Sequence, residues 1–397
     1  MKKLLLIVPM LHQGGFERVC VQTARLLQDR YDVTILLFND EDINFDITGL
    51  NVVNINVPSK DGTLNKIINV FKRAVKTRKY KKEHNIDISY SFGPTANFVN
   101  VLSRAGEKTL TGLRGYNDME RPREIRLFCK KSDKVLSCSK DILTELKSDF
   151  NYHNGEYIYN PLDVENIRLK SLEDSEEKDL CELKNSGKFI ISFMGRDVYI
   201  KSLWHMLKAF YMVHEKHTDI ELIVLGDGSF DEDRKLAKDL GIEDCVKFLG
   251  VKKNPFPYIA ASDLFALPSN HEGFPNALIE AMALGKPVIA ADCKTGPREI
   301  VLSKQQYEEL ASVDGTKHKI PDTIEGDYGI LIPDMSCVPN RNPDDRDEEV
   351  LFAKELLKMI EDPQRLKLYG EKALKRAKDF SPEAYRDELD DIFRRLG

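Results

Sequence analysis

Short apolar runs alternate with longer amphipathic stretches along the chain. In the first part, the runs are rich in aliphatic and β-branched residues, and the stretches between them have a helical period. The expected strands are Leu4–Val8, Val33–Phe38, Val52–Val57, Ile86–Ser91 and Val135–Cys138, and the expected helices include Glu17–Gln28 and Thr63–Lys82. Short buried strands separated by helices predict a parallel, doubly wound α/β sheet.

The same pattern starts again after residue 188. The second set of expected strands is Phe189–Met194, Glu221–Leu225, Val246–Leu249, Leu264–Pro268, Pro287–Ala290 and Gly329–Ile332. A chain of 397 residues exceeds one ordinary core, so we expect two domains. We place the first domain at 1–160, a polar and acidic linker at 161–188 and the second domain at 189–380. Pro161 supports this boundary, because the residue before a proline is driven out of the helical region.

Composition places the chain among ordinary globular proteins, with 42% hydrophobic and 31% charged residues. This excludes collagen-like and wholly disordered chains. Seven scattered cysteines without a Cys-x-x-Cys spacing favour a reducing compartment over a disulfide framework or a zinc site. No apolar run approaches the roughly 20 residues that cross a bilayer. We therefore expect a cytoplasmic protein, at most peripheral on the inner face of a membrane.

The charges are unevenly distributed: residues 1–160 contain 25 Lys/Arg against 19 Asp/Glu, and the remainder 34 against 46. Between Lys66 and Lys82 there are eight basic residues and no acidic one. Ile67, Phe71, Ala74 and Val75 recur there at helical spacing, which predicts charges on the other face. Two interpretations stay open: a helix that rests on an anionic membrane, or one that packs on its sheet by that apolar stripe. We do not expect nucleic-acid binding, because only Phe71 and Tyr80 are interleaved with these charges and no recognition motif is present.

Two loops carry candidate chemistry, because ligands of open α/β sheets bind at the carboxyl ends of the strands. The first is Gly14-Gly15, just before a helix. The second follows the strand that ends near Pro268 and carries Glu272. We expect its helix over Ala277–Leu284, so that a phosphate could bind the amides of its first turn, those of Asn276, Ala277 and Leu278. Taken singly, Glu272 could be a capping carboxylate and Glu280 part of a solvated helix face.

Glu272 and Glu280 are separated by seven residues, within HEGFPNALIEAMALGKPVI. This resembles the Glu-x(7)-Glu signature of the retaining GT-B glycosyltransferases of family 4, also called group 1, in their bacterial form. Further matching motifs are FMGRDVYIK at 193–201, GDG at 226–228, FLGV at 248–251, GPREI at 296–300 and YGILIP at 328–333. The resemblance implies two Rossmann-like domains that face each other across a cleft, with acceptor binding in the first and nucleotide-sugar binding in the second.

The resemblance also implies roles for individual residues. Arg196 and Lys201 would clamp the donor diphosphate, Glu272 would contact the transferred sugar, and Glu280 would bind the ribose. Arg196, Lys201 and Glu272 are the catalytic candidates. The donor-binding set is Gly14, Gly15, Arg196, Lys201, Val246, Phe248, Glu272, Gly273, Phe274, Pro275, Asn276, Ala277, Leu278 and Glu280. Family frequency favours UDP over GDP as the nucleotide.

No metal or other cofactor is expected, because two cations and a helix N-terminus can stabilise the leaving diphosphate. Asp231-Glu232-Asp233 matches the Asp-x-Asp pattern of metal-dependent glycosyltransferases, but acidic residues in this position are typical of the start of a helix. His214 and His217 lack a third ligand in the sequence. The family's usual N-domain histidine is absent from 88–99 and 110–118. The acceptor-side candidates are therefore His12, Ser91, Arg114 and Asn117.

The sequence thus predicts a metal-independent, retaining transferase that moves a sugar from a nucleotide-sugar to a glycan or lipid-linked acceptor, in surface polysaccharide or glycolipid synthesis. The alternatives are a non-catalytic, glycosyltransferase-like partner subunit and a sugar-nucleotide epimerase of the same fold. In this fold the last helix commonly returns to the first domain. The apolar stripe of 383–396, which follows Pro382, favours that return.

Overall fold

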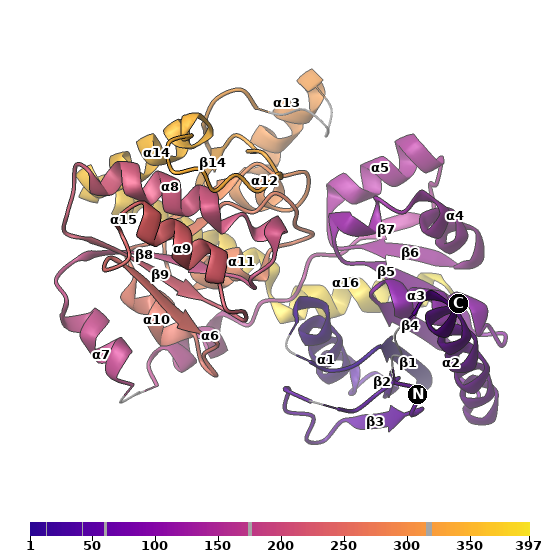
Figure 1. Cartoon of the computed structure of the whole chain (residues 1–397). Coiled ribbons are helices and arrows are strands. Elements are labelled where there is room, and N and C mark those ends of the chain that lie inside the picture. Colours follow the sequence, from indigo (N-terminus) through magenta and orange to yellow (C-terminus); the bar gives the residue numbers. More distant parts are fainter. Residues whose placement is uncertain (13, 42, 59–61, 174–176, 315–319) are drawn as a thin grey trace. The chain divides into compact units, whose positions relative to one another are not determined.

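The computed structural model describes residues 1–12, 14–41, 43–58, 62–173, 177–314 and 320–397 (Figure 1). The chain divides into two compact units. Unit 1 contains Met1–Pro161 together with Pro382–Gly397, and unit 2 contains Leu162–Ser381. Both are α/β. Within the described residues, no helix is long and apolar enough to span a membrane.

Unit 1 is built on a seven-stranded sheet of order β3-β2-β1-β4-β5-β6-β7, in which every described pair is parallel. Its elements are β1 (Lys2–Val8), α1 (Gly15–Leu27), β2 (Tyr31–Leu37), β3 (Asn51–Asn54), α2 (Thr63–His84), β4 (Ile88–Phe92), α3 (Pro94–Leu102), β5 (Lys108–Leu113), the 3₁₀ turn η1 (Tyr116–Asp118), α4 (Pro122–Lys131), β6 (Lys134–Ser137), α5 (Lys140–Phe150), β7 (Gly155–Tyr157) and α16 (Pro382–Arg395).

Strand β1 shows why both faces of this sheet are covered. Alternate side chains of a strand point to opposite faces. Leu4 and Leu6 belong to the core cluster shared with α1 and α16, whereas Leu5 and Ile7 belong to a second cluster with α3. A run that is apolar at every position is therefore buried on both sides, as in other parallel sheets.

Helix α16 is part of the unit 1 core, although it lies at the end of the chain. Its buried residues are Tyr385, Leu389, Asp390, Ile392 and Phe393. The Tyr385 hydroxyl lies 2.7 Å from Thr23 Oγ1 of α1. Asp390 accepts hydrogen bonds from Arg30 Nη1 at 2.6 Å and from the Tyr31 hydroxyl at 2.7 Å.

Unit 2 repeats the plan with the strand order β10-β9-β8-β11-β12-β14-β13, and among its described strand pairs only that of β13 with β14 is antiparallel. Its elements are α6 (Val164–Ser171), α7 (Lys178–Asn185), β8 (Phe189–Met194), the 3₁₀ turn η2 (Tyr199–Lys201), α8 (Leu203–His214), β9 (Ile220–Leu225), α9 (Asp231–Asp239), β10 (Val246–Gly250), α10 (Phe256–Ala261), β11 (Leu264–Leu267), α11 (Asn276–Ala283), β12 (Val288–Ala291), α12 (Pro297–Val301), α13 (Lys304–Asp314), β13 (Ile324–Glu325), β14 (Ile330–Ile332), η3 (Asp347–Glu349), α14 (Val350–Glu361), α15 (Pro363–Ala377) and η4 (Lys378–Phe380).

The predicted linker at 161–188 requires a correction, because most of it is folded into unit 2. Ile167 of α6 and Leu180 and Leu183 of α7 are buried. Lys252 lies 2.6 Å from both Glu177 and Asp179, which fixes α7 to the loop after β10. The acidic composition of this segment reflects these surface contacts, while its few leucines anchor it.

Strands β5 and β7 are absent from the sequence-based prediction. Strand β5 reads KTLTGL, and Thr109 and Thr111 are fully buried. The Thr109 hydroxyl donates to Glu107 at 3.1 Å, and the Thr111 hydroxyl lies 2.9 Å from that of Ser132. Because their hydroxyl groups are paired with Glu107 and Ser132, these threonines fit a buried strand without producing an apolar run.

Candidate functional site

The strand order of unit 2 reverses between β8 and β11, which are neighbours in the sheet. The carboxyl ends of the strands at such a switch point form the usual ligand crevice of a doubly wound sheet. The segment after β8 contains Arg196 and Lys201, and the segment after β11 contains Glu272. The topology therefore places the segments that carry the three catalytic candidates at the carboxyl ends of two adjacent strands.

Lys201 and Glu272 form a direct ion pair across this switch point. Lys201 Nζ lies 2.6 Å from Glu272 Oε1, and the side chains are 19% and 9% exposed. Helix α11 has no side-chain cap, so Glu272 is not the capping carboxylate that the sequence left open. The pair is partly shielded from water, which strengthens its attraction relative to an exposed pair.

Arg196 lies on a turn that packs tightly against the GDG turn after β9. A Cβ on Gly226 would lie 1.9 Å from the carbonyl oxygen of Gly195, so this close backbone approach requires glycine. The amide of Asp197 donates to the Asp227 carbonyl at 2.7 Å, and the Asp197 carboxylate accepts from the Phe230 amide at 2.8 Å. The Arg196 side chain itself is exposed, and the residue after it is held by these hydrogen bonds.

The loop after β12 supports the Glu272 loop from the other side. The Thr295 hydroxyl donates to the backbone carbonyl of Glu272. Gly296 has φ +93°, and a Cβ there would lie 2.6 Å from Pro275 Cδ and 2.8 Å from the Gly273 carbonyl oxygen. The GPREI motif therefore begins with glycine because two loops meet there.

Helix α11 starts one residue before the predicted position and places Glu280 in its interior, 4% exposed. Glu280 is thus not on a solvated helix face. Leu278 needs a correction, because its amide already donates to the Pro275 carbonyl at 3.1 Å and is not available for a phosphate. Asn276 and Ala277 are the first two residues of the helix, so both belong to its first turn, as the sequence predicts.

Other members of the predicted donor set have packing roles. Phe274 is buried, and its ring centroid lies 5.1 Å from that of Phe380. Val246 is buried in the core of unit 2. The Phe248 ring packs against Phe230 at 5.8 Å and lies 4.4 Å from the Arg234 guanidinium. Any contact of β10 with a nucleotide base would therefore involve the main chain.

Asn270, which the sequence analysis does not select, lies at the centre of this arrangement. Its side chain is 2% exposed, and its amide N–H donates to the Ile200 carbonyl at 3.0 Å. Its Nδ2 donates to the Met335 carbonyl at 2.8 Å, and its Oδ1 accepts from the Ser202 hydroxyl. The only signal in the sequence is an amide side chain within a strand-ending loop, which by itself is too common to be informative.

The acidic and histidine residues that resemble metal-binding motifs in the sequence contact other protein side chains. Arg341 lies 2.6 Å from Glu232 and 3.1 Å from Asp233 at the start of α9. His214 faces Cys245 Sγ at 3.8 Å, while His217 pairs with Glu361 at 3.1 Å, so the two histidines point to separate neighbours. Within the described residues, three or more His, Cys, Asp or Glu side chains do not gather in a metal-binding arrangement.

The unit 1 candidates differ in accessibility. His12 and Asn117 are exposed, whereas Ser91 is fully buried and donates to Asn97 Oδ1 at 2.7 Å, so it does not face an acceptor. Arg114 donates to Asn160 Oδ1 at 3.2 Å and stacks over the Phe92 ring at 4.8 Å. It is half-buried among neutral partners.

The glycine loop of unit 1 lies at the start of α1. Gly14 is the N-cap residue, and Gly15 is the first helical residue. A Cβ on Gly14 would lie 2.1 Å from Glu17 Oε2, so the absent side chain leaves room for this carboxylate. Gln13, which precedes the pair, lies outside the described residues.

Helix α2 does not pack by its apolar stripe. Ile67, Phe71 and Val75 are 50%, 59% and 69% exposed, and only Ala74 of the predicted stripe is buried. The predicted placement of all charges on the outer face is also wrong, because Arg73 and Lys81 point inward. Arg73 Nε donates to the Val57 carbonyl at 2.9 Å.

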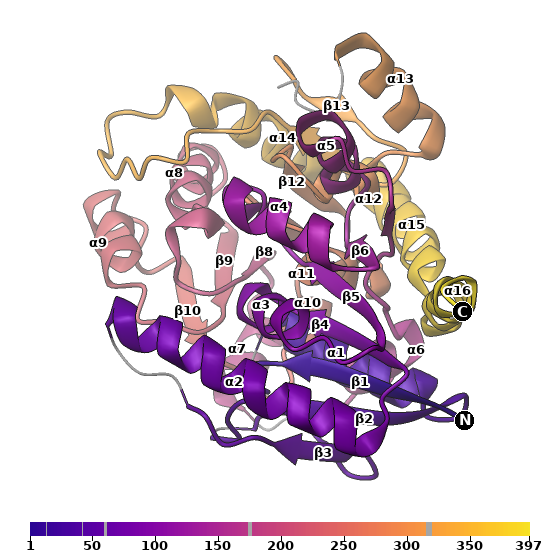
Figure 2. The same ribbon diagram turned by 90° about the vertical axis from the view of Figure 1, so that its right-hand side faces the viewer.

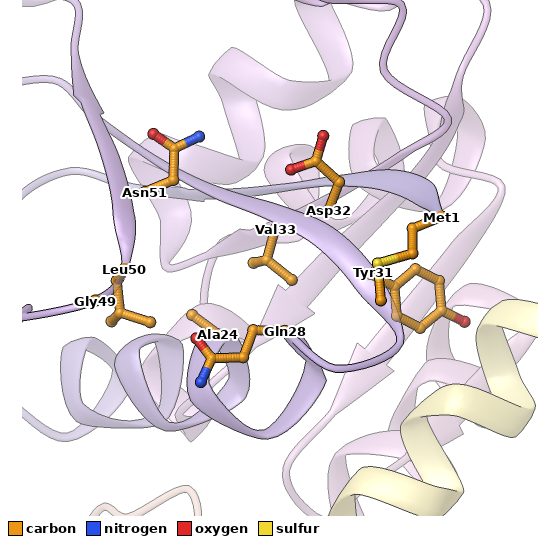
Figure 3. Close-up of a pocket in the computed structure, with 9 residues that line it drawn as sticks. All are labelled: Met1, Ala24, Gln28, Tyr31, Asp32, Val33, Gly49, Leu50 and Asn51. Carbon is orange, nitrogen blue, oxygen red and sulfur yellow. The ribbon is translucent and has the colours of Figure 1, made fainter.

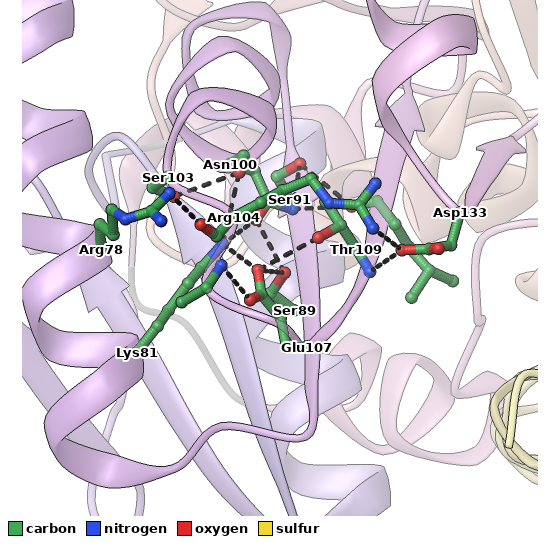
Figure 4. Close-up of polar contacts among 12 residues, drawn as sticks. Arg78, Lys81, Ser89, Ser91, Asn100, Ser103, Arg104, Glu107, Thr109 and Asp133 are labelled. Atoms are coloured by element: carbon green, nitrogen blue, oxygen red, sulfur yellow. Dashed lines mark hydrogen bonds and ion pairs between the residues drawn. The ribbon is translucent and has the colours of Figure 1, made fainter.

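Lys81 belongs to a buried polar network between α2, α3 and β5 (Figure 4). Its Nζ lies 2.6 Å from Glu107 Oε1 and 2.7 Å from Asn100 Oδ1. Burial lowers the pKa of Lys81 to about 8, against the opposing effect of Glu107. These contacts hold the inner face of α2 by polar groups, so its apolar face is turned outward.

Two pockets of unit 1 are lined by none of the predicted site residues. One of ≈ 280 Å³ is lined by residues at the start of β2, the end of α1 and the segment before β3 (Figure 3). The other, ≈ 340 Å³, includes Tyr80 and His84 of α2 and Asp32 of β2. Both include residues at the amino-terminal end of β2, and neither contains a residue of the predicted donor set.

Comparison with known proteins gives consistent matches along both units. Residues 174–313 match the model of glycosyl transferases group 1, and residues 13–166 match that of glycosyltransferase family 4. The chain is 31% identical over 332 residues to the Campylobacter jejuni N-acetylgalactosamine-N,N'-diacetylbacillosaminyl-diphospho-undecaprenol 4-alpha-N-acetylgalactosaminyltransferase, covering 79% of this chain and 87% of the relative.

Two further proteins match over most of the chain. The amylovoran biosynthesis glycosyltransferase AmsD of Erwinia amylovora is 27% identical over 312 residues, 76% of this chain and 83% of that protein. The Anabaena protein HepE, solved in complex with UDP-glucose, superposes with a TM-score of 0.73 at 19% identity, covering 99% of this chain and 100% of that chain. This last likeness concerns the fold.

Proposed function

The chain belongs to the GT-B glycosyltransferases of family 4, or group 1, and we propose that it transfers a sugar with retention, without a metal, from a UDP-sugar to a lipid-linked acceptor. Family membership makes it a sugar-transferring enzyme, and relatives such as the Campylobacter jejuni transferase and AmsD support a role in surface-glycan synthesis. The observation that carries the finer proposal is the Lys201–Glu272 ion pair at the switch point of unit 2.

Donor binding in this proposal exchanges one ion pair for another. The donor diphosphate competes with Glu272 for the Lys201 ammonium, and the exposed Arg196 supplies a second cation. Glu272, released from Lys201, accepts hydrogen bonds from the hydroxyls of the transferred sugar. The buried Glu280 binds the ribose hydroxyls from the interior of α11.

The chemistry follows from where charge develops. As the glycosidic bond breaks, negative charge grows on the diphosphate, and positioned cations stabilise it without reorganisation. The acceptor hydroxyl attacks from the face that the diphosphate leaves, and a donor phosphate oxygen takes its proton. This route requires positioning more than a protein base. It is consistent with the absence of a histidine from 88–99 and 110–118.

The relatives support the classes of donor and acceptor. The Campylobacter jejuni enzyme acts on a diphospho-undecaprenol-linked glycan, as its name says, and it covers both units of this chain. HepE, which shares the fold, is solved with UDP-glucose. We therefore propose UDP as the nucleotide and a polyprenyl-diphosphate-linked glycan as the acceptor.

An acceptor of this kind is held in a membrane, and we propose that α2 rests on the surface of that membrane. Ile67, Phe71 and Val75 lie on one outward face, and the exposed Lys82 lies on that face two turns after Val75. Apolar side chains would enter the headgroup region while cations meet anionic lipids. Each lysine or arginine near an anionic membrane surface contributes about 1 kcal/mol to the free energy of membrane binding.

The test is a transfer assay with purified protein, a panel of UDP- and GDP-sugars and polyprenyl-diphosphate-linked glycans. The proposal expects transfer from a UDP-sugar that persists in a chelator, with NMR of the product showing the anomeric configuration of the donor. Inverted product, restoration by Mg²⁺ after chelation, or exclusive use of a GDP-sugar would each refute the corresponding part. Epimerised nucleotide-sugar would favour the epimerase instead.

A further inference from the structure

Asn270 touches both neighbours of Lys201 and lies two residues before Glu272. Its backbone N–H donates to the Ile200 carbonyl at 3.0 Å, and its Oδ1 accepts from the Ser202 hydroxyl. One buried amide residue thus joins the turn that carries Lys201 to the loop that carries Glu272. The separation of the two charged side chains depends on this connection.

Ser202 shows why the turn needs external support. It is a non-glycine residue with φ +52° and is fully buried. The left-handed region is unfavourable for residues with a Cβ and persists only where the surroundings impose it. The hydrogen bond from the Ser202 hydroxyl to Asn270 provides such a constraint, directly after Lys201.

A third loop fixes the orientation of the Asn270 amide. Nδ2 donates to the Met335 carbonyl at 2.8 Å and lies 3.3 Å from Asp334 Oδ1, both in the segment after β14. With two acceptors facing Nδ2, the oxygen has to point to Ser202. The segments after β8, β11 and β14 therefore meet at one side chain.

We infer that Asn270 is a positioning residue that sets Lys201 against Glu272 for the leaving diphosphate, an inference that rests on the proposed function of that pair. A displacement of about 1 Å can cost roughly 10²-fold in rate. Asn270→Ala should therefore lower kcat about 10- to 100-fold while changing KM for the donor less than about threefold. Ser202→Ala, which removes only one link, should cause a smaller loss of kcat.

Asn97→Ala is the matched control. Asn97 is equally buried and makes three side-chain hydrogen bonds, but it lies in unit 1. It should lose comparable thermal stability and retain kcat. In the double variant Lys201→Ala/Asn270→Ala, kcat should be no lower than in Lys201→Ala, because Asn270 acts through Lys201. The inference would be overturned if the loss of kcat in the double variant equalled the product of the losses in the two single variants. Equal kcat in Asn270→Ala and Asn97→Ala would also overturn it.

Hydrogen–deuterium exchange separates this inference from the proposed function. Amides of 199–202 should exchange at least tenfold faster in Asn270→Ala and remain unchanged in Asn97→Ala. Unchanged protection of this turn would refute the positioning role even in an active enzyme. Absence of transfer by the wild-type protein, with the exchange difference present, would refute the proposed chemistry and leave the link between the two loops intact.

Discussion

Lys201 Nζ lies 2.6 Å from Glu272 Oε1, and the two residues come from the segments after β8 and β11, the adjacent strands at which the order of the unit 2 sheet reverses. The sequence distance between them is 71 residues. Their meeting is a consequence of topology, and in the proposed function the donor diphosphate has to displace Glu272 from Lys201.

Replacing the two cations should impair transfer strongly. Lys201→Ala and Arg196→Ala should each lower kcat by about 10²- to 10³-fold, the range typical of losing a charge-stabilising donor. Lys201→Ala should also lower thermal stability, because Glu272 loses its partner in a partly buried place, whereas Arg196→Ala should not. Steady-state kinetics measures the loss of kcat, and thermal unfolding measures the change in stability. Lys235→Ala, which removes an exposed lysine, is the control. Full activity of Arg196→Ala would contradict the assignment.

Removing the Glu280 carboxylate should weaken nucleotide binding. A hydrogen bond to a charged group contributes about 1.5–3 kcal/mol, so Glu280→Ala should raise Kd for UDP about 10- to 100-fold. Ribose contacts exist in both the ground state and the transition state, so kcat should change less than Kd. Calorimetric titration measures the affinity. An unchanged Kd would show that Glu280 does not bind the ribose.

The outward face of α2 predicts a specific membrane affinity. The double variant Phe71→Ser/Val75→Ser should reduce binding to vesicles of phosphatidylcholine and phosphatidylglycerol by at least about tenfold, since burial of each such side chain contributes about 1.5–3 kcal/mol when complete. Wild-type binding should fall with added salt and be weak on pure phosphatidylcholine. Cosedimentation measures it.

The matched control for α2 is Val338→Ser/Leu368→Ser, which removes two apolar side chains that are also exposed, 68% and 48%, but lie in unit 2. It should bind vesicles like the wild-type protein. Equal binding by the α2 variant and this control would contradict the proposed role of α2.

Helix α16 should determine the stability of unit 1. Leu389 is fully buried in its core, so Leu389→Ala should cost about 2–5 kcal/mol there. Exchange of α1 amides should accelerate, while β8 and β9 of unit 2 keep their protection. The same change in both units would be inconsistent with α16 as a part of unit 1. Truncation after Phe380 should have the stronger effect of exposing apolar surface.

Asp118 should make unit 1 less stable as pH rises above 4. Burial raises the pKa of Asp118 to about 6 from its ordinary value, despite hydrogen bonds from the amides of Arg114 and Gly115. The protonated form is thus favoured in the folded state, and its contribution is present below the unfolded pKa and lost as pH rises through about 6. Relative to Asp118→Asn, the wild-type protein should lose about 2–3 kcal/mol between pH 4 and pH 7. Denaturant unfolding of both proteins between pH 4 and pH 7 measures this loss. A difference in the free energy of unfolding that stays constant over this range would contradict the raised pKa of Asp118.

The sequence predicted most of the fold, because the buried strands of both sheets are continuous apolar runs such as Leu4–Val8. Strand β5 could not be found in this way, since its threonines are satisfied by Glu107 and Ser132, which lie outside the strand. The sequence left open which face of α2 packs on the sheet, for a related reason. Which face of α2 packs depends on Glu107 and Asn100 as partners for Lys81, and a helical period contains no information about them.

The candidate site shows the same limit. The spacing of Glu272 and Glu280, together with the resemblance, was enough to select the loop and helix, and the strand order then places Lys201 beside Glu272. Asn270 could not be selected, because its importance lies in backbone groups of Ile200 and Met335, and any residue type provides a carbonyl. Contacts to the main chain cannot be predicted from the types of side chain in a sequence.

The most direct test of the central claim is thermal unfolding of the wild-type protein and of Arg196→Ala/Lys201→Ala with and without UDP. A ligand at about a hundredfold excess over Kd stabilises the native state by roughly 2.7 kcal/mol. We expect UDP to raise Tm of the wild-type protein by several degrees and to leave the double variant nearly unchanged. Equal shifts in both proteins, or no shift of the wild-type protein with any UDP or GDP compound, would contradict a nucleotide site at the carboxyl ends of β8 and β11.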